Sequence, residues 1–109
     1  MYNLAELLGQ VVTIKSHKGD EYVATLLGID TDNNVLTVKR PKIVVIDQNS
    51  VALIPFALTA HADMVYLHTN QIFTVMQSLP GAAEDYLNLI AEEDQQILEE
   101  MASDTAELS

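Results

Sequence analysis

The chain has no cysteine and few basic residues, and both scarcities limit what it can do. Without cysteine it has no disulfide framework, no thiolate metal site and no thiol nucleophile, which fits a reducing, cytoplasmic environment. Its 109 residues include only five Lys and Arg against 16 Asp and Glu, which gives a net charge of −11. A basic surface is the usual sign of a nucleic-acid-binding protein. Whether this class of protein is excluded therefore depends on how the charges are distributed along the chain.

The acidity is concentrated in the C-terminal part of the chain. From Pro80 onward there are nine acidic residues and no basic ones, whereas residues 1–79 hold the other seven acidic residues and all five bases. The first part therefore has a net charge of only about −2. The total charge does not exclude nucleic-acid binding by that part.

The chain also lacks a long uninterrupted apolar run. The longest candidate, "VALIPFALTAHADMVYL", is interrupted by Pro55, His61 and Asp63 and falls short of the roughly 20 apolar residues of a membrane span. The opening "MYNLAELLG" contains Glu6 and no basic residue, unlike a secretory signal. With 49% hydrophobic residues the chain is too apolar for general disorder. We expect one folded, soluble domain with an appendage.

Apolar residues alternating with a period of two predict a β domain over residues 1–79. A short helix is expected first, with Asn3 as its N-cap and Gly9 at its end. Gly28 marks a bend or bulge in the second strand. Five strands joined by short turns have to curl into a barrel to bury their apolar face. They are expected at 10–16, 21–29, 35–46, 51–67 and 72–77, the fourth one broken near Pro55 and at 60–63.

Residues 80–109 change to a helical period. Apolar residues at steps of three and four predict an amphipathic acidic helix, with a polar break at Asp94 and a frayed tail from residue 103. Its apolar stripe is a packing surface, either for its own barrel, for a neighbouring subunit or for a partner. The positions that define the period are Ala83, Leu87, Ile90, Asp94, Ile97 and Met101.

Two stretches resemble the sequence motifs of the Sm-like (LSm) family. "MVYLHTNQIFTV" is similar to the second motif, an apolar strand, a three-residue loop and another apolar strand. Over Leu4–Met76, the resemblance implies a mainly β fold: a five-stranded, strongly bent antiparallel sheet forming an open barrel after a short N-terminal helix. The C-terminal helix is then an addition, and residues 39–62 form an enlarged loop between the third and fourth strands. The first motif is matched by Gly19, Tyr22, Ala24, Leu26, Asp30, Asn34 and Val35.

Several residues depart from the family pattern. Ala24 stands where the family usually has glycine, so we expect a less sharply bent second strand. Asn33 replaces an apolar or aromatic residue that stacks on a base in many members, and His68 and Thr69 replace an Arg-Gly pair whose Arg contacts nucleic acid. We expect weaker phosphate binding, because imidazole lacks the permanent charge and forked donors of Arg. The sequence resembles a divergent member, as expected of a phage or environmental lineage.

The resemblance implies a homo-oligomeric ring of about five to seven subunits, in which the fourth strand of one subunit pairs with the fifth strand of the next. The last strand supports this interpretation, because it is apolar on both faces and has no charge or proline to protect it from edge-to-edge pairing. The expected interface residues are Val65, Leu67, Ile72, Phe73, Val75 and Met76.

The same resemblance places a binding rim for single-stranded RNA at two loops. Amide and imidazole groups can bind base edges, but Asp and Asn also suit turn positions for purely conformational reasons, and both interpretations stay open. A calcium loop starting at Asp30 fails, because Val35 replaces the required glycine and Pro41 the bidentate Glu. The candidate rim residues are Asp30, Asn33, Asn34, His68, Thr69 and Asn70.

Lys39, Arg40 and Lys42 form the one basic cluster. They suit phosphate contact and equally suit the protection of a strand edge at Pro41. His61, Asp63 and His68 have no spacing typical of a compact metal site.

We therefore expect neither a metal nor a cofactor. No arrangement of nucleophile and base is visible, so we do not expect an enzyme. The leading hypothesis is an RNA-binding ring. The alternative is an adaptor ring that binds protein through Ile43–Leu58 and the acidic helix.

Overall fold

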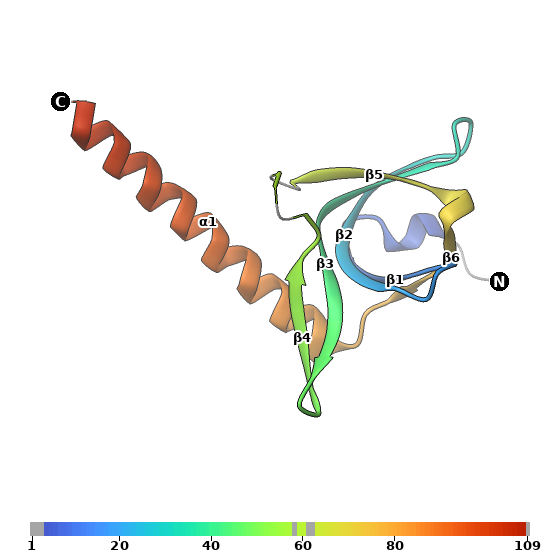
Figure 1. Cartoon of the computed structure of the whole chain (residues 1–109). Coiled ribbons are helices and arrows are strands. Elements are labelled where there is room, and N and C mark those ends of the chain that lie inside the picture. Colours follow the sequence, from blue (N-terminus) through green and yellow to red (C-terminus); the bar gives the residue numbers. More distant parts are fainter. Residues whose placement is uncertain (1–3, 58, 61–62, 109) are drawn as a thin grey trace.

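The computed structural model describes residues 4–57, 59–60 and 63–108, with 103–108 described by their backbone alone. A strongly curved antiparallel sheet follows a short 3₁₀ turn, and one long helix leads away from the sheet (Figure 1). This confirms the mainly β fold class with a short N-terminal helical turn and an added C-terminal helix. The elements are η1 Leu4–Leu7, β1 Val11–Ser16, β2 Glu21–Asp30, β3 Val35–Asp47, β4 Ser50–Pro55, β5 Met64–His68, η2 Thr69–Gln71, β6 Ile72–Gln77 and α1 Pro80–Leu108.

The sheet is an open barrel. Its strands lie in the order β4-β3-β2-β1-β6, and β5 also pairs with β3. β2 curves around the core with two register shifts, one between Val23 and Thr25 and one between Leu26 and Gly28. The second shift is the bulge predicted at Gly28, and such bulges increase local bending and twist. The concave side buries Leu7, Val12, Ile14, Ala24, Leu26, Leu36 and Val38.

The segment predicted as an enlarged loop is mostly a β hairpin, so the number of strands is six rather than five. β3 continues to Asp47 and pairs along Lys42–Asp47 with β4, whereas its first part, Val35–Lys39, pairs with β5. The chain bends between these halves, where Arg40 has a φ of +45°. The predicted fourth strand with its break is therefore two separate strands. β4 pairs with the second part of β3, and β5 pairs with the first part.

Helix α1 is continuous from Pro80 to Leu108. Asp94, the predicted polar residue within its apolar stripe, faces the sheet and pairs with Arg40. After Gly81 the helix contains no glycine or proline that would interrupt it. Its first half packs on the convex side of the sheet, where Tyr86 and Ile90 contact Val23. This answers one open question in part: Ile90 of the apolar stripe and the neighbouring Tyr86 pack on the chain's own barrel, whereas Leu87 of the stripe is half-exposed.

Candidate functional site

Asp30 orders the β2–β3 loop. Its carboxylate accepts hydrogen bonds from the backbone N–H groups of Asp32 (3.1 Å) and Asn33 (3.0 Å) and from the side-chain amide of Asn33 (2.8 Å). Asn34 follows with a φ of +57°, a left-handed conformation that Asn tolerates better than most residues. Asp30 therefore shapes the loop, and part of the Asn33 amide is already engaged by it.

The loop between β5 and β6 lies directly beside the β2–β3 loop. Thr69 N–H donates to the carbonyl of Asn34 at 2.9 Å, and His68 is the strand partner of Val35. The structure thus brings together the two groups of predicted rim residues, which are about thirty-five positions apart in the chain. Asn70 lies in η2, the 3₁₀ turn that connects β5 to β6. The two loops form one continuous polar rim.

The hydrogen bonds to Asp30 make the rim sensitive to acid. Those from Asn33 are the main cause that lowers the pKa of Asp30 below its ordinary 3.8. A lowered native pKa means that this group adds stability above pH 3.8, which is lost as pH falls through the native pKa. We expect Asp30→Ala to lower the melting temperature at pH 7, and the difference from the unsubstituted protein to vanish toward pH 2. Calorimetry at both pH values checks this, and a constant difference would contradict it.

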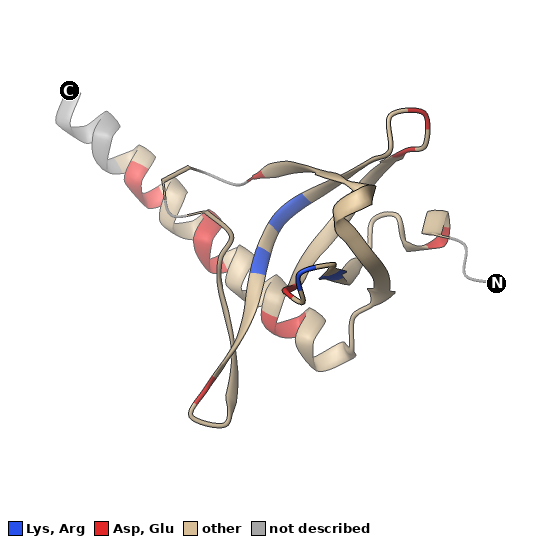
Figure 2. Cartoon of the chain, turned by 45° about the vertical axis from the view of Figure 1, so that its right-hand side comes forward, with Lys and Arg blue, Asp and Glu red and all other residues tan. Residues whose placement is uncertain are grey.

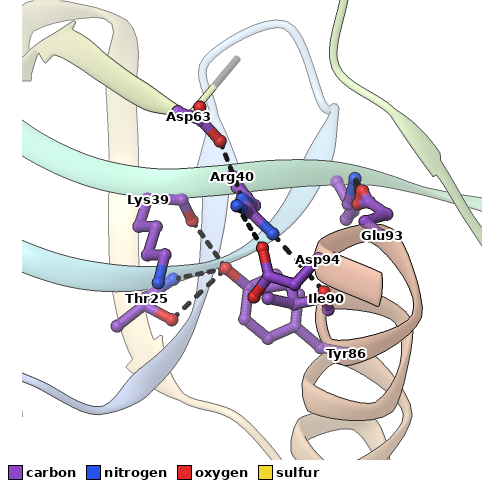
Figure 3. Close-up of polar contacts among 9 residues, drawn as sticks. Thr25, Lys39, Arg40, Asp63, Tyr86, Ile90, Glu93 and Asp94 are labelled. Carbon is purple, nitrogen blue, oxygen red and sulfur yellow. Dashed lines mark hydrogen bonds and ion pairs between the residues drawn. The ribbon is translucent and has the colours of Figure 1, made fainter. Parts of the chain in front are cut away.

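The predicted basic cluster is engaged by acidic side chains of the same chain. Arg40, whose side chain is only 13% exposed, pairs with Asp63 at 2.8 Å and with Asp94 of α1 at 2.6 Å. It also donates to the carbonyl of Ile90 at 3.4 Å. Burial opposes the charged form, but the hydrogen bonds and charges of Asp94 and Asp63 outweigh it and raise the pKa of Arg40. These contacts fasten the bend of β3 to the helix (Figure 3).

Lys42 is bound in the same way. Its side chain is buried, and its ammonium group lies 2.5 and 2.7 Å from the two carboxylate oxygens of Glu93. Figure 2 shows the basic part of β3 beside the acidic turns of α1. Lys39 is half-buried, and its carbonyl accepts a hydrogen bond from α1. The cluster lies under the helix rather than on the rim, and two of its three charges hold the helix in place.

Removing the carboxylate from the Lys42–Glu93 pair should destabilise the fold. Glu93→Gln leaves a buried ammonium group without its counter-charge, a loss of up to about 3–5 kcal/mol when a pair is fully buried. Because the Glu93 side chain is 29% exposed, we expect about 1–3 kcal/mol. Urea denaturation measures it.

Glu92→Gln on the adjacent exposed position is the matched control and should change stability by less than about 0.5 kcal/mol. Lys42→Met/Glu93→Gln should recover most of the loss, since an apolar side chain needs no counter-charge. If Glu93→Gln is as stable as the control, the pair does not hold the helix.

An aromatic cavity beside the rim was not predicted. It measures about 350 Å³ and lies between β1, β2, β5 and η2. Tyr22 and Phe56 meet there edge to face, with ring centroids 5.6 Å apart, and His68 connects the cavity to the rim. Tyr22 was identified only as a family-motif residue, and Phe56 lies in a segment without a motif. The wall is formed by Ile14, Ser16, Lys18, Asp20, Tyr22, Phe56, Tyr66, Leu67, His68, Gln71 and Ile72.

Strands β5 and β6 are edges of the described sheet, each with one strand partner there: β3 for β5 and β1 for β6. Of the predicted interface residues, Val65, Leu67, Ile72 and Val75 pack against the barrel core. Phe73 and Met76 are exposed, as are Met64 and Tyr66, which the prediction did not include. Successive side chains of a strand point to opposite faces of the sheet, which separates the residues that pack on the core from the exposed ones.

Within residues 4–57, 59–60 and 63–108, no group of three His, Cys, Asp or Glu side chains is placed to hold a metal ion. His61, one member of the triplet considered from the sequence, lies outside the described residues. In the same part of the chain, no helix is both long and apolar enough to cross a bilayer.

Comparison with known proteins identifies the fold. No protein-family model matches the sequence, and no curated protein does. A heptameric archaeal Sm protein matches with a TM-score of 0.50 and 13% identity, over 70% of this chain and 96% of that one. A P. aerophilum SmAP1 heptamer matches with 0.49 and 14%, over 70% and 88%. A chain of a CoA-bound NatC complex also matches with 0.49 and 14%, over 77% and 95%.

The first of these similarities shows that the chain has an Sm-like fold. It confirms the fold that the two sequence motifs indicated. At such low identity the similarity concerns the fold alone, and the function has to be argued from the residues of the site.

Proposed function

We propose that the chain assembles into a homo-oligomeric ring through β5 and β6, and that the rim of this ring binds single-stranded RNA. The observation that supports the ring is the pair of open sheet edges with large exposed apolar side chains, Tyr66 on β5 and Phe73 on β6. Pairing the two edges between copies is a head-to-tail contact, which gives a ring when the rotation from one copy to the next closes. The protein with the similar fold is described as a heptamer.

The rim supports the RNA part of the proposal. Its amides and imidazole are groups that bind the edges of unpaired bases, and an aromatic cavity of about 350 Å³ adjoins them. A ring repeats this site once per subunit, so weak contacts act together. With Arg40 and Lys42 already paired to acidic side chains, base contacts rather than phosphate contacts provide most of the affinity.

Fluorescence anisotropy with labelled A-rich and U-rich oligoribonucleotides tests RNA binding. We expect binding that is detectable at low salt and weaker at physiological salt. His68→Ala/Asn70→Ala should weaken it about tenfold, because losing base stacking costs about 1–3 kcal/mol per base. Gln95→Ala/Gln96→Ala, on the exposed side of α1, is the control. If no RNA binds at low salt, the RNA part of the proposal fails.

A second candidate function is an adaptor ring that binds protein, and one observation favours it. The acidic helix neutralises the basic cluster, and its second half leads away from the barrel (Figure 1) with Leu98 and Met101 exposed. Replacing Leu98 and Met101 together by Ser tests this function by the loss of captured partners. If the rim variants abolish capture and the helix variants do not, the adaptor interpretation fails.

A further inference from the structure

Strand β4 is a third open edge of the sheet, separate from the two edges assigned to the ring. Within the described residues it lies at the end of the strand order and pairs only with β3. Its sequence, "SVALIP", has no charged residue, and Val51 and Ile54 are exposed. Natural proteins usually protect such an edge with charges, proline, bulges or a covering element, and β4 carries Pro55, which lacks an N–H, as its last residue. The edge from Ser50 to Ile54 is suited to strand addition by a partner.

Helix α1 forms a wall beside this edge. Leu53 packs against the cluster that contains Tyr86 and Ile90, so the helix lies over one face of β4. In Figure 1, α1 crosses β4 and continues past it. A groove of about 300 Å³ separates them, lined by Val51, Leu53, Asp85, Asn88, Leu89 and Glu92. A strand added to β4 would extend the sheet under the helix, with alternate side chains directed toward this wall.

The wall carries negative charge that the fold does not use. Asp85 and Glu92 are exposed and lie on the same face of the helix, about two turns apart. Neither is in an ion pair among the described residues, unlike Glu93 and Asp94. The four ion pairs of the described residues engage Lys15, Arg40 and Lys42, none with the groove. The groove is therefore apolar on the strand side and acidic on the helix side.

We propose that β4 and α1 together bind an extended cationic peptide segment of a partner protein, added as a strand to the free edge of β4. Main-chain hydrogen bonds to β4 give the affinity, and Lys or Arg at alternate positions pair with Asp85 and Glu92. This inference gives the adaptor function a site and a partner chemistry, and so rests on that function. It does not require the ring, because β4 is not one of the ring edges.

Titration of the full chain with short labelled peptides tests the inference. The probe is an alternating Lys-Val peptide that matches the six residues of β4. Its first control has Glu in place of each Lys, and its second is N-methylated at alternate residues so that it cannot pair with a strand edge. We expect binding of the Lys-Val peptide alone. Equal binding of the N-methylated peptide would show a purely electrostatic contact and overturn strand addition.

Two variants and one localisation experiment complete the test. Asp85→Asn/Glu92→Gln should weaken peptide binding about fivefold, as expected for two exposed charge pairs. Glu99→Gln/Glu100→Gln removes the same charge from α1 outside the groove and should have no effect. Hydrogen exchange should show protection in Ser50–Pro55. Protection confined to β5 or β6, or equal weakening by both variants, would contradict the inference, whether or not the chain forms a ring.

Discussion

Replacing Tyr86 by Ala should destabilise the protein by about 3–5 kcal/mol, the range observed for large buried aromatic residues. Tyr86 is fully buried and belongs to the cluster that attaches α1 to the sheet, together with Val23 and Ile90. Since a domain of this size has a total stability of about 5–15 kcal/mol, the loss is large. Urea denaturation at fixed protein concentration measures it, because assembly would make the stability concentration-dependent.

The hydroxyl group of Tyr86 has its own part in this effect. It donates to the carbonyl of Lys39 at 2.6 Å and accepts hydrogen bonds from the backbone N–H and the hydroxyl of Thr25 at 3.1 and 3.2 Å. Thr25 and Lys39 are strand partners next to the register shift between Val23 and Thr25. The hydroxyl group is thus inserted between β2 and β3 where the bulge disturbs the regular ladder (Figure 3).

Tyr86→Phe isolates that contribution. It keeps the ring but leaves the Lys39 carbonyl and the Thr25 N–H without their shared partner, which costs about 1–3 kcal/mol. Leu87→Ala, at the next and half-exposed position of α1, is the matched control and should change stability by less than about 0.5 kcal/mol. If Tyr86→Phe is as stable as the unsubstituted protein, the hydroxyl does not link the strands.

The pH dependence of the same contact has a definite sign. Burial is the main cause that raises the pKa of Tyr86 above 10.0. A raised native pKa favours the neutral phenol in the folded state, so its stabilisation is present below pH 10.0 and is lost as pH rises through the native pKa. The stability difference between the unsubstituted protein and Tyr86→Phe should therefore decrease in alkaline solution.

The sequence predicted the barrel better than the attachment of the helix. The strands of the barrel follow from patterns within short segments, whereas the attachment depends on contacts between residues far apart in the chain. Alternating residues such as Val12 and Ile14 show the buried face of a strand locally. The contact of Tyr86 with Lys39 spans 47 positions, and no pattern within the helix distinguishes Tyr86 from its apolar neighbours. The bulge that Tyr86 bridges, between Val23 and Thr25, lies at Ala24, where the replacement of the family glycine led us to expect a less sharply bent strand.

The candidate sites also divide into those that local sequence indicates and those that depend on a distant partner. The turn residues at Asp30 and Asn34 were found because turns have local chemistry, and their neighbour His68 was found through the second family motif. The role of Lys42 could not be chosen from the sequence, since its partner Glu93 is 51 positions away. The acidic helix pairs with two of the three basic residues of the cluster and packs on Val23 of β2 as well as on the β3–β4 hairpin.

Phe73→Glu should prevent the proposed ring from forming and leave mainly monomers. Phe73 is 72% exposed on the β6 edge, and a carboxylate in an apolar interface has to be desolvated without a partner. Ile46→Glu is the matched control, because Ile46 is 79% exposed on the β3–β4 hairpin, away from both ring edges. Light scattering should give the assembled mass for the control and the unsubstituted protein. Circular dichroism should show that both variants are folded.

A second variant on the opposite edge makes the test independent of any folding defect. Tyr66→Arg, at a 64% exposed position of β5, should also give monomers when alone. Each variant keeps one intact edge, β5 in Phe73→Glu and β6 in Tyr66→Arg, so a mixture of the two can form an unaltered contact. The remaining edges then bring Arg opposite Glu, which favours the next contact as well. Native mass spectrometry should detect complexes containing both variants in the mixture. If each variant alone keeps the assembled mass, or if the mixture stays monomeric, β5 and β6 are not the contacts that build the assembly.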